Sequence, residues 1–409
     1  MKTLKMALRN LRRNLRRSLI TGVAIAFGMA LLIFSSGFGD GAHGAMIESG
    51  VASLAGHVVI QGEGWQQKRE NDIVVPSSPA VAAQLRELMP GGKVVSRVYM
   101  QGLLTSPTGS VGAALTAVDP EEEKQVGNIH EKMVAGDYLD GTDTGLVLGK
   151  TLAETLDVEL GDKVVLMVQR DGEIESRLLR VQGLFSFGVD EIDGFTGQIM
   201  LPTAQELLGL GQDVTQISLH LDSYREAEAA TAQVRAAMAA PGLDILAWQE
   251  ALPDLYMWIA LDDAGLYVMI IIIALVVLLG IVNTVLMSVL ERMKEFGVML
   301  ALGATPARLA TLVMTEAALL GLFAVSVGLI LGLLGNWPMA VYGVNFADMM
   351  GGQTMEAGGV AMDMHFYADL SASKTIFFCA LAYGMTLLAA IYPAVKAAKL
   401  KPIECLQHR

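Results

Sequence analysis

Four long apolar segments constrain the fold of this 409-residue chain more than any other feature. Each reaches or exceeds roughly 20 residues, the length that an α-helix needs to cross the hydrocarbon core of a bilayer. In the whole chain 53% of the residues are hydrophobic and 17% are charged, a balance typical of membrane proteins. We therefore predict four transmembrane helices, at residues 18–38, 264–290, 309–335 and 375–395.

Basic residues predict which ends of these helices face the cytoplasm, because lysine and arginine gather on that side. Residues 1–17 hold seven basic residues and no acidic one. More basic residues follow in the connector, residues 291–308, and in the tail, residues 396–409. We therefore predict that both termini and the connector are cytoplasmic. Residues 39–263 and the methionine-rich loop 336–374 are then extracytoplasmic.

Residues 1–17 place leucines on one helical face and basic residues on the others. This pattern predicts an amphipathic helix on the inner membrane surface, with its basic residues towards anionic head groups. A basic flank that serves only topology is the alternative. A cleaved signal peptide is disfavoured, because the next apolar segment exceeds the roughly 7 to 15 residues of a signal-peptide core.

Residues 39–263 are predicted to form a large mixed α/β domain. They contain 34 acidic and 14 basic residues, a net charge of −20, which disfavours nucleic acid as a partner. Short strand patterns alternate with helical patterns, and the segment is long enough for two subdomains. The expected strands are 57–62, 93–106, 112–119, 145–149, 163–170, 175–188, 197–202, 216–221 and 243–248. The expected helices are 79–89, 150–158, 203–210 and 224–239. We expect hairpin turns at 161–162 and 171–172, which are Gly-Asp and Asp-Gly pairs.

The run GLVLGKT at residues 145–151 resembles the end of a phosphate-binding loop. Such a loop needs a glycine five positions before Gly149, but Thr144 stands there, and the preceding residues are polar and acidic rather than a buried strand. A strand followed by a helix is therefore the favoured interpretation. No serine–histidine–aspartate pattern or other catalytic constellation occurs, so an enzyme acting by itself is disfavoured.

The second predicted span continues outward as a stalk. Between residues 254 and 290 there is no proline, and glycine occurs only at positions 265 and 280. A continuous helix of this length would measure about 55 Å, which exceeds the thickness of a bilayer.

The loop 336–374 is rich in methionine. Thioether sulfur suits Cu(I), but a chain with 23 methionines can also use them as a flexible apolar contact surface, which we favour. The loop contains Met339, Met349, Met350, Met355, Met362, Met364 and His365.

The connector carries charged residues at the exit of the second span and then a short apolar helical segment, FGVMLALGA. Gly303 and Pro306 are expected to end this helix before the third span begins. A helix too short to cross the membrane could dock into a groove of a cytoplasmic partner, or it could be a re-entrant or interfacial loop. The pattern alone leaves both interpretations open.

The connector, together with the C-terminal run YPAVKAAKLKPIECL, resembles the permease subunits of the MacB, LolC/LolE and FtsX group of ABC transporters. In that group the segment E-R-x-x-E-[IF]-G-x-x-x-A-x-G-A forms a coupling helix, and the element P-A-x-x-A-x-x-x-x-P-x-E-x-L ends the chain. The resemblance implies that the coupling residues here are Glu291, Arg292, Lys294, Glu295, Phe296, Gly297, Ala301, Gly303 and Ala304. The matching C-terminal residues are Pro393, Ala394, Ala397, Pro402, Glu404 and Leu406.

This resemblance implies a subunit of the bacterial inner membrane that binds no cofactor itself. ATP and Mg would be bound by a separate cytoplasmic ABC ATPase dimer, and a second permease copy or paralogue would complete the transporter. The stalks would carry ATPase motion to the periplasmic domains, a mechanism called mechanotransmission. Cargo would be a lipoprotein or an amphiphile, taken up with a periplasmic carrier or adaptor. In size and layout the chain most resembles LolC and LolE, which release lipoproteins. A MacB-like efflux pump and an FtsX-like signalling module that controls a cell-wall hydrolase are the alternatives.

Three further positions in the third span are noted. Gly328 and Gly332 form a G-x-x-x-G pattern that is compatible with close helix packing at a seam between two permeases. Glu316 is an ionisable residue within a span, which favours a functional role, although it is near enough to the cytoplasmic end to reach the head groups.

Overall fold

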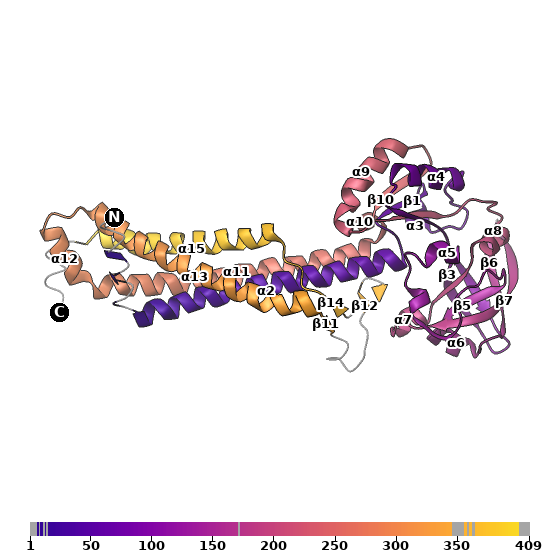
Figure 1. Ribbon diagram of the computed structural model, residues 1–409, viewed down its shortest axis with the longest axis horizontal. Coiled ribbons are helices and arrows are strands. Elements are labelled where there is room, and N and C mark those ends of the chain that lie inside the picture. The colour runs from indigo at the N-terminus through magenta and orange to yellow at the C-terminus, as the bar shows by residue number, and fades with distance from the viewer. Residues whose placement is uncertain are drawn as a thin grey trace. The chain divides into compact units, whose positions relative to one another are not determined.

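The structure is a computed structural model that describes residues 6–7, 9–10, 13, 15–170, 172–345, 356–357, 360–361 and 365–400. The chain divides into two compact units. The first, here called the membrane unit, comprises residues 1–42, 261–344 and 366–409. The second, here called the α/β unit, comprises residues 43–260 and 345–365. Figure 1 labels most of the helices and strands of both units.

Four long helices contain the predicted spans. They are α2 (Leu15–Ser53), α11 (Pro253–Glu291), α13 (Pro306–Tyr342) and α15 (Ala372–Ala398). By length and composition each is able to cross a membrane, as predicted. The expected continuous helix over 254–290 is confirmed, since α11 runs through it without a break.

The first helix is longer than predicted, because α2 continues past residue 38 to Ser53. The glycine-rich run GFGDGAHG favours an end here on sequence grounds, since glycine weakens helices. In the structure two of these glycines, Gly37 and Gly41, pack closely within the membrane unit. A Cβ on Gly37 would lie 2.5 Å from Oδ1 of Asn336, and one on Gly41 would lie 2.0 Å from the carbonyl oxygen of Tyr367.

The four long helices pack together inside the membrane unit. One cluster of buried side chains joins Ile25 of α2, Ile281 of α11, Ala324 of α13 and Ala389 of α15. A second joins α2, α11 and α15 through Met29, Ile33, Ile270 and Phe378. Much of the apolar surface of α11 stays uncovered within the chain, including Ile271, Leu275 and Val276. Lipid tails or another membrane helix would cover such a surface.

The α/β unit is built on one sheet, to which ten strands contribute in the described part of the chain. The strands are β1 (Val58–Gly62), β2 (Lys93–Thr105), β3 (Ser110–Val118), β4 (Met133–Gly136), β5 (Gly145–Gly149), β6 (Lys163–Arg170), β7 (Glu173–Phe185), β8 (Thr196–Met200), β9 (Gln216–His220) and β10 (Leu243–Ala247). The helices are α3 (Trp65–Lys68), α4 (Ser78–Leu88), α5 (Pro120–Glu123), α6 (Lys150–Leu156), α7 (Asp190–Asp193), α8 (Leu201–Leu208), α9 (Ala227–Met238) and α10 (Trp248–Ala251), with 3-10 turns η1 (Ile129–Glu131) and η2 (Tyr224–Glu226).

Short elements complete the secondary structure. The connector forms α12 (Met293–Ala301), and the region after α13 contains the two-residue strands β11 (Val344–Asn345), β12 (Glu356–Ala357), β13 (Val360–Ala361) and β14 (His365–Phe366).

The sheet has two parts that share the long strand β2. In the first part, β10, β1, β9 and the start of β2 pair in that order, all antiparallel. In the second part, β2 pairs with β3 and β6, and the order β3-β8-β5-β7-β6 closes the sheet back onto β2 as a barrel. The pairs β3–β8 and β5–β7 are parallel. Residue 97 of β2 is the point where pairing passes from β9 to β3.

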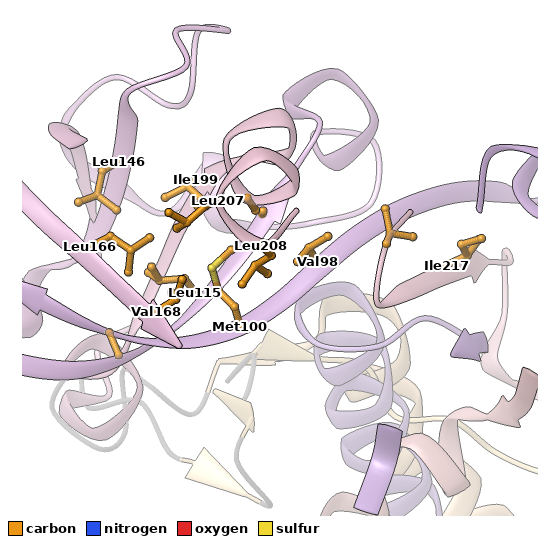
Figure 2. Packing of buried hydrophobic residues seen from close by; sticks show 14 of the residues in the cluster. Val98, Met100, Leu115, Leu146, Leu166, Val168, Ile199, Leu207, Leu208 and Ile217 are labelled. Atoms are coloured by element: carbon orange, nitrogen blue, oxygen red, sulfur yellow. The ribbon is translucent and has the colours of Figure 1, made fainter. Parts of the chain in front are cut away.

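Both parts of the sheet contribute to one apolar core (Figure 2). Val98 and Met100 of β2 lie beside Leu115 of β3 and Leu207 and Leu208 of α8. Alternate residues of β2 face this core, which is the period expected of a strand with one buried side. The core therefore holds the two parts of the sheet together.

The strands and helices expected between residues 57 and 248 are present, with ends shifted by a few residues. The hairpin turn expected at residues 171–172 is confirmed by the antiparallel pairing of Arg170 with Glu173. The hairpin expected at residues 161–162 is wrong, because this turn joins α6 to β6. Gly161 adopts φ +89° there, a conformation that glycine accepts readily. Strand β4 was not predicted.

The run GLVLGKT forms β5 and the start of α6. A Cβ on Gly149 would lie 2.1 Å from the carbonyl oxygen of Asp193, so close backbone packing explains this glycine. Lys150 is exposed and lies 3.8 Å from Glu154 of its own helix. The local structure is the predicted strand and helix.

Some predicted features lie outside the described residues. They are residues 402, 404 and 406 of the C-terminal motif and Met349, Met350, Met355, Met362 and Met364 of the methionine-rich loop.

Candidate functional site: the connector between α11 and α13

The connector turns the chain from α11 into a short separate helix. Arg292 leaves helical geometry, with φ −101° and ψ 12°, and α12 begins at Met293. The nine residues of α12 would span about 13 Å, well short of the roughly 30 Å of a bilayer core. The predicted short helix is confirmed, although it starts three residues earlier than the run FGVMLALGA.

The helix ends at the predicted glycine. Gly303 has φ +90°, and its N–H donates to the carbonyl of Leu300 at 3.0 Å. The N–H of Ala304 donates to the carbonyl of Met299 at 2.9 Å. These two bonds are those of a Schellman motif, which satisfies the last carbonyls of a helix through a left-handed residue. Pro306 then occupies the first turn of α13.

A buried ion pair holds the start of α12 to the third membrane helix. Nη1 of Arg292 donates to both carboxylate oxygens of Glu316, each at 2.9 Å. The two side chains are 6% and 15% exposed. The guanidinium also lies 5.0 Å from the ring centroid of Phe296, close enough for a cation–π contact. Breaking such a pair on one side leaves an uncompensated buried charge, so it fixes the geometry at this corner.

The N-terminal segment adds two contacts. Nδ2 of Asn10 donates to Oε1 of Glu316 at 2.5 Å, and Nη2 of Arg13 donates to Oε1 of Glu295 at 2.5 Å. Glu295 also accepts a bond of 3.2 Å from Nε of Arg292. Burial opposes ionisation of Glu295, but the hydrogen bonds from Arg13 and Arg292 outweigh it and lower the pKa of this carboxyl.

One face of α12 is buried in an apolar cluster of the membrane unit. Phe296 is fully buried there and packs with Val289 of α11, Leu312 of α13 and Ala394 of α15. Ala7 of the N-terminal segment is part of the same cluster. The described N-terminal residues therefore pack on the connector. The sequence pattern predicts a helix on the membrane surface for this segment, without a contact to the connector.

The opposite face of α12 is uncovered and apolar. Leu302 is 83% exposed and Val298 is 47% exposed, with Ala301 exposed beside them. Next to this tip, a hollow of about 280 Å³ is lined by Met6, Met299, Leu302, Gly303, Ala304, Arg308, Leu309 and Leu312. An exposed apolar tip beside a hollow is typical of a contact surface for another protein.

The predicted coupling residues lie on α12 and on the residues that flank it, from Glu291 at the end of α11 to Ala304, and some are buried while others are exposed. Arg292, Phe296 and Gly297 are buried, whereas Glu291, Lys294, Glu295, Ala301 and Gly303 are exposed and Ala304 is half-buried. Glu316, noted separately in the sequence, joins them as the partner of Arg292. Asn10 and Arg13 were missed, because a basic leader carries no signal that singles out two of its residues as contacts.

The G-x-x-x-G pattern of α13 packs inside the chain. A Cβ on Gly328 would lie 2.7 Å from both the carbonyl oxygen of Ala26 and Cβ of Met29, and one on Gly332 would lie 2.7 Å from Cβ of Ile33. These contacts are with α2 of the same chain, so the predicted seam between two permeases does not describe these glycines. The pattern correctly indicated close helix packing, but not which helix is the partner.

Two families match this chain. Residues 18–237 match the MacB-like periplasmic core domain, and residues 267–402 match the FtsX-like permease C-terminal region. The lipoprotein-releasing system transmembrane protein LolC of Neisseria meningitidis serogroup B is 23% identical over 319 residues, covering 76% of this chain and 77% of that protein. The protein of the same name from Xylella fastidiosa strain Temecula1 is 22% identical over 407 residues, covering 96% and 94%.

Solved structures include similar regions. The periplasmic region of MacB from Actinobacillus actinomycetemcomitans shares 16% identity at a TM-score of 0.35, covering 49% of this chain and 92% of that region.

Proposed function

Because this chain belongs to the family of ABC transporter permeases with a MacB-like periplasmic core domain and an FtsX-like C-terminal region, we propose that it couples a separate ATPase to periplasmic work. It is an inner-membrane protein, and its relatives are transporter components rather than catalytic enzymes. In our proposal the partner ATPase dimer binds ATP and Mg at the cytoplasmic face. Its motion reaches the α/β unit on the periplasmic side and extracts a lipoprotein or an amphiphile from the membrane.

The observation that carries this proposal is the geometry of α12. A docking element must present an uncovered contact surface and must also be held firmly, so that movement of the partner moves the permease. The exposed tip at Leu302 and Val298 meets the first requirement. The buried pair of Arg292 and Glu316, with Phe296 packed among the membrane helices, meets the second. A re-entrant loop would have no need of both features.

Two helices could carry the motion away from the connector. Helix α11 ends one residue before Arg292 and is continuous for 39 residues. Helix α2 is equally long, and both helices contribute residues to the membrane unit and to the α/β unit. Because a continuous helix resists compression along its axis, it can transmit displacement without any substrate passing through the membrane unit.

The cargo proposal follows from the relatives. The LolC proteins of Neisseria and Xylella are named as lipoprotein-releasing, and they cover most of this chain. We propose the same class of cargo, a protein anchored by acyl chains, with a second permease copy or paralogue completing the membrane part. Reconstituted complex should then release a lipid-anchored protein from vesicles when ATP and a soluble carrier are added. Release that needs an adaptor and an outer-membrane duct, or ATP-dependent activation of a cell-wall hydrolase without release, would favour the efflux or signalling alternative.

Docking is tested by placing a charge on the exposed tip. In Leu302→Asp the chain should fold, since this side chain is almost fully exposed, but it should no longer co-purify with its ATPase subunit. The matched control is Ile174→Asp, an equally apolar residue that is 74% exposed in the α/β unit. If Leu302→Asp retains the ATPase as well as Ile174→Asp does, the docking proposal is refuted.

A further inference from the structure

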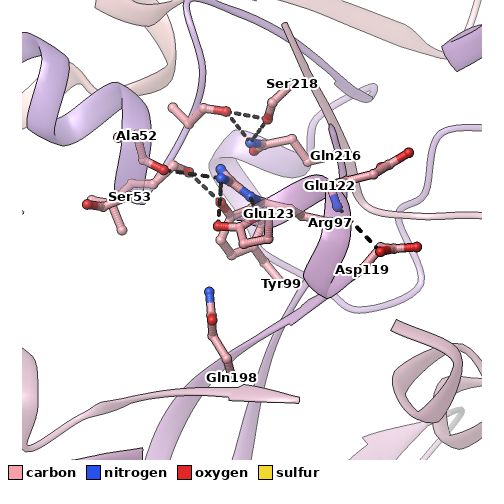
Figure 3. A network of polar contacts seen from close by, with 12 residues as sticks. Ala52, Ser53, Arg97, Tyr99, Asp119, Glu122, Glu123, Gln198, Gln216 and Ser218 are labelled. Carbon is pink, nitrogen blue, oxygen red and sulfur yellow. Dashed lines mark hydrogen bonds and ion pairs between the residues drawn. The ribbon is translucent and has the colours of Figure 1, made fainter. Parts of the chain in front are cut away.

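The end of helix α2 is held by side chains of the sheet (Figure 3). Helix α2 ends at Ser53, within the α/β unit. The last four carbonyls of a helix have no partner within the helix, so they must be satisfied by other groups. Side chains of β2 and β9 donate hydrogen bonds to three carbonyls here. One is that of Ala52 in the last turn of α2, and the others are those of Leu54 and Ala55, which follow the helix.

Arg97 of β2 makes the central contact. Its Nη2 donates to the carbonyl of Ala52 at 3.1 Å, and the residue is completely buried. Its Nε and Nη2 also donate to the two oxygens of Glu123, each at 2.9 Å, so the buried cation is paired. Cations are favoured at the negative end of a helix dipole. The guanidinium therefore joins α2, β2 and α5 at one point.

Three further side chains hold the same segment. The Tyr99 hydroxyl donates to the carbonyl of Leu54 at 2.6 Å, Nε2 of Gln216 donates to the carbonyl of Ala55 at 2.9 Å, and the Ser218 hydroxyl donates to that same carbonyl. Tyr99 lies on β2, and the other two lie on β9. Figure 3 shows these groups around the end of α2.

The contacts meet at the branch of the sheet. In the register of β2, Arg97 is opposite Gln216 of β9 and also opposite Val118 of β3. Strand β9 belongs to the four-stranded part and β3 to the barrel. The end of α2 is therefore fastened where both parts of the sheet begin, rather than to the surface of either.

Apolar packing secures the same turns of α2 from another side. Met46, Ile47 and Val51 form a buried cluster with Trp248 and with Leu255 of α11. The polar contacts thus act on a helix end that is already packed. A cap that served only stability would need to satisfy the carbonyls, but it would not need to join them to the branch point of the sheet.

We propose that Arg97, Tyr99, Gln216 and Ser218 are positioning residues, here called the α2 clamp, through which displacement of helix α2 reaches both parts of the sheet. This inference rests on the proposed function, since it names the residues that pass the motion on. Loosening the clamp should lower the cargo released per ATP hydrolysed, while ATPase binding and ATP hydrolysis stay unchanged.

The test uses two tyrosines of the same unit. Tyr99→Phe removes the bond to Leu54 and also the acceptor of a bond of 3.4 Å from Nη1 of Arg97. Tyr138→Phe removes a bond of 2.8 Å to Oε1 of Gln198 on β8 and none of the bonds to the carbonyls at the end of α2. Both hydroxyls are on half-buried residues and each donates one hydrogen bond. The full-length permease with its ATPase should show cargo release per ATP reduced about fivefold or more in Tyr99→Phe, since one lost hydrogen bond can produce a factor of about five and this variant loses two. Release by Tyr138→Phe should stay near wild type.

Ser218→Ala provides a second, independent loosening of the clamp and should lower release per ATP in the same way. Hydrogen exchange at the amides of residues 50–55 supplies a readout that does not depend on transport, and it should be faster in both clamp variants than in Tyr138→Phe. Equal release by Tyr99→Phe, Ser218→Ala and Tyr138→Phe would overturn the clamp. If the wild-type chain does not associate with its ATPase, the proposed function is overturned instead. The hydrogen-exchange rates of residues 50–55 then still test whether the clamp contacts hold the end of α2.

Discussion

The buried pair of Arg292 and Glu316 gives a prediction whose size can be worked out from the structure. In Glu316→Gln the shape of the side chain is kept and its charge is removed. Arg292 then keeps the half-exposed carboxylate of Glu295, at 3.2 Å from its Nε, while the bond from Asn10 can still reach the remaining oxygen of the amide that replaces the carboxylate. The exchange therefore tests the ion pair rather than the packing around it.

The expected cost is large because both groups are shielded from water. Removing one partner of a buried ion pair costs roughly 3–5 kcal/mol, and since glutamine keeps one acceptor we expect about 2–3 kcal/mol. Glu295→Gln is the matched control. Its carboxylate is 44% exposed and pairs with Arg13 and Arg292, so the same exchange should cost about 0–1 kcal/mol.

Thermal unfolding of the purified chain in detergent measures this difference. Glu316→Gln should unfold at a clearly lower temperature than Glu295→Gln, and it should bind less ATPase because the start of α12 is no longer fixed. Replacing both partners, as Arg292→Met with Glu316→Leu, should restore most of the stability, since no unpaired charge remains. Equal stability of the two glutamine variants would refute the assignment of Arg292 and Glu316 as a structural pair.

Two further predictions concern packing and pH. Gly332→Ala should lower the unfolding temperature, because the added Cβ would meet Ile33 of α2 at 2.7 Å, whereas Gly384→Ala has open space and should be neutral or stabilising in the same thermal assay. Burial, then the nearby Arg97 and His57, lower the pKa of His220 well below 6.5 in the folded chain. Between that folded pKa and 6.5 the unfolded chain binds more protons, so unfolding free energy should fall as pH falls below 6.5, by up to about 1.4 kcal/mol per pH unit. Denaturant unfolding at several pH values should show a weaker slope in His220→Gln; an unchanged slope would exclude this histidine as the cause.

The membrane helices could be predicted from the sequence because hydropathy acts over a whole segment and needs no knowledge of neighbours. The predicted span ends at residue 38, and no pattern indicated that α2 continues to Ser53 through the glycine-rich segment that contains Gly37 and Gly41. Their purpose is close contact with Asn336 and Tyr367, more than 290 positions away in the chain, which no local pattern reveals.

The connector was predicted well because its signals are local. Gly303 and Pro306 mark the end of one helix and the start of the next through backbone geometry that few residues accept. The contacts that hold α12 could not be predicted in the same way. Arg292 and Glu316 were both noted in the sequence, but their pairing depends on how α11 and α13 pack, and the contact of Asn10 with Glu316 crosses 306 positions.

The α/β unit shows the same limit. The pattern of KVVSRVYM predicts a strand, and Arg97 within it looks like a solvent-facing residue of that strand. Its burial depends on Glu123 and on the carbonyl of Ala52, and neither contact leaves a trace in the local sequence. Strand β4 was missed because it has only four residues, MVAG, and contains no polar residue that would mark the alternation of a strand in the sequence.

The shared strand β2 has a consequence for how the α/β unit loses its structure. Its 13 residues supply one edge of the four-stranded part and one wall of the barrel. Slipping its register by a single residue would turn Val98, Met100 and Leu104 away from the core in both places at once. Neither part can therefore melt while the other keeps its order, and the unit should come apart in one cooperative step.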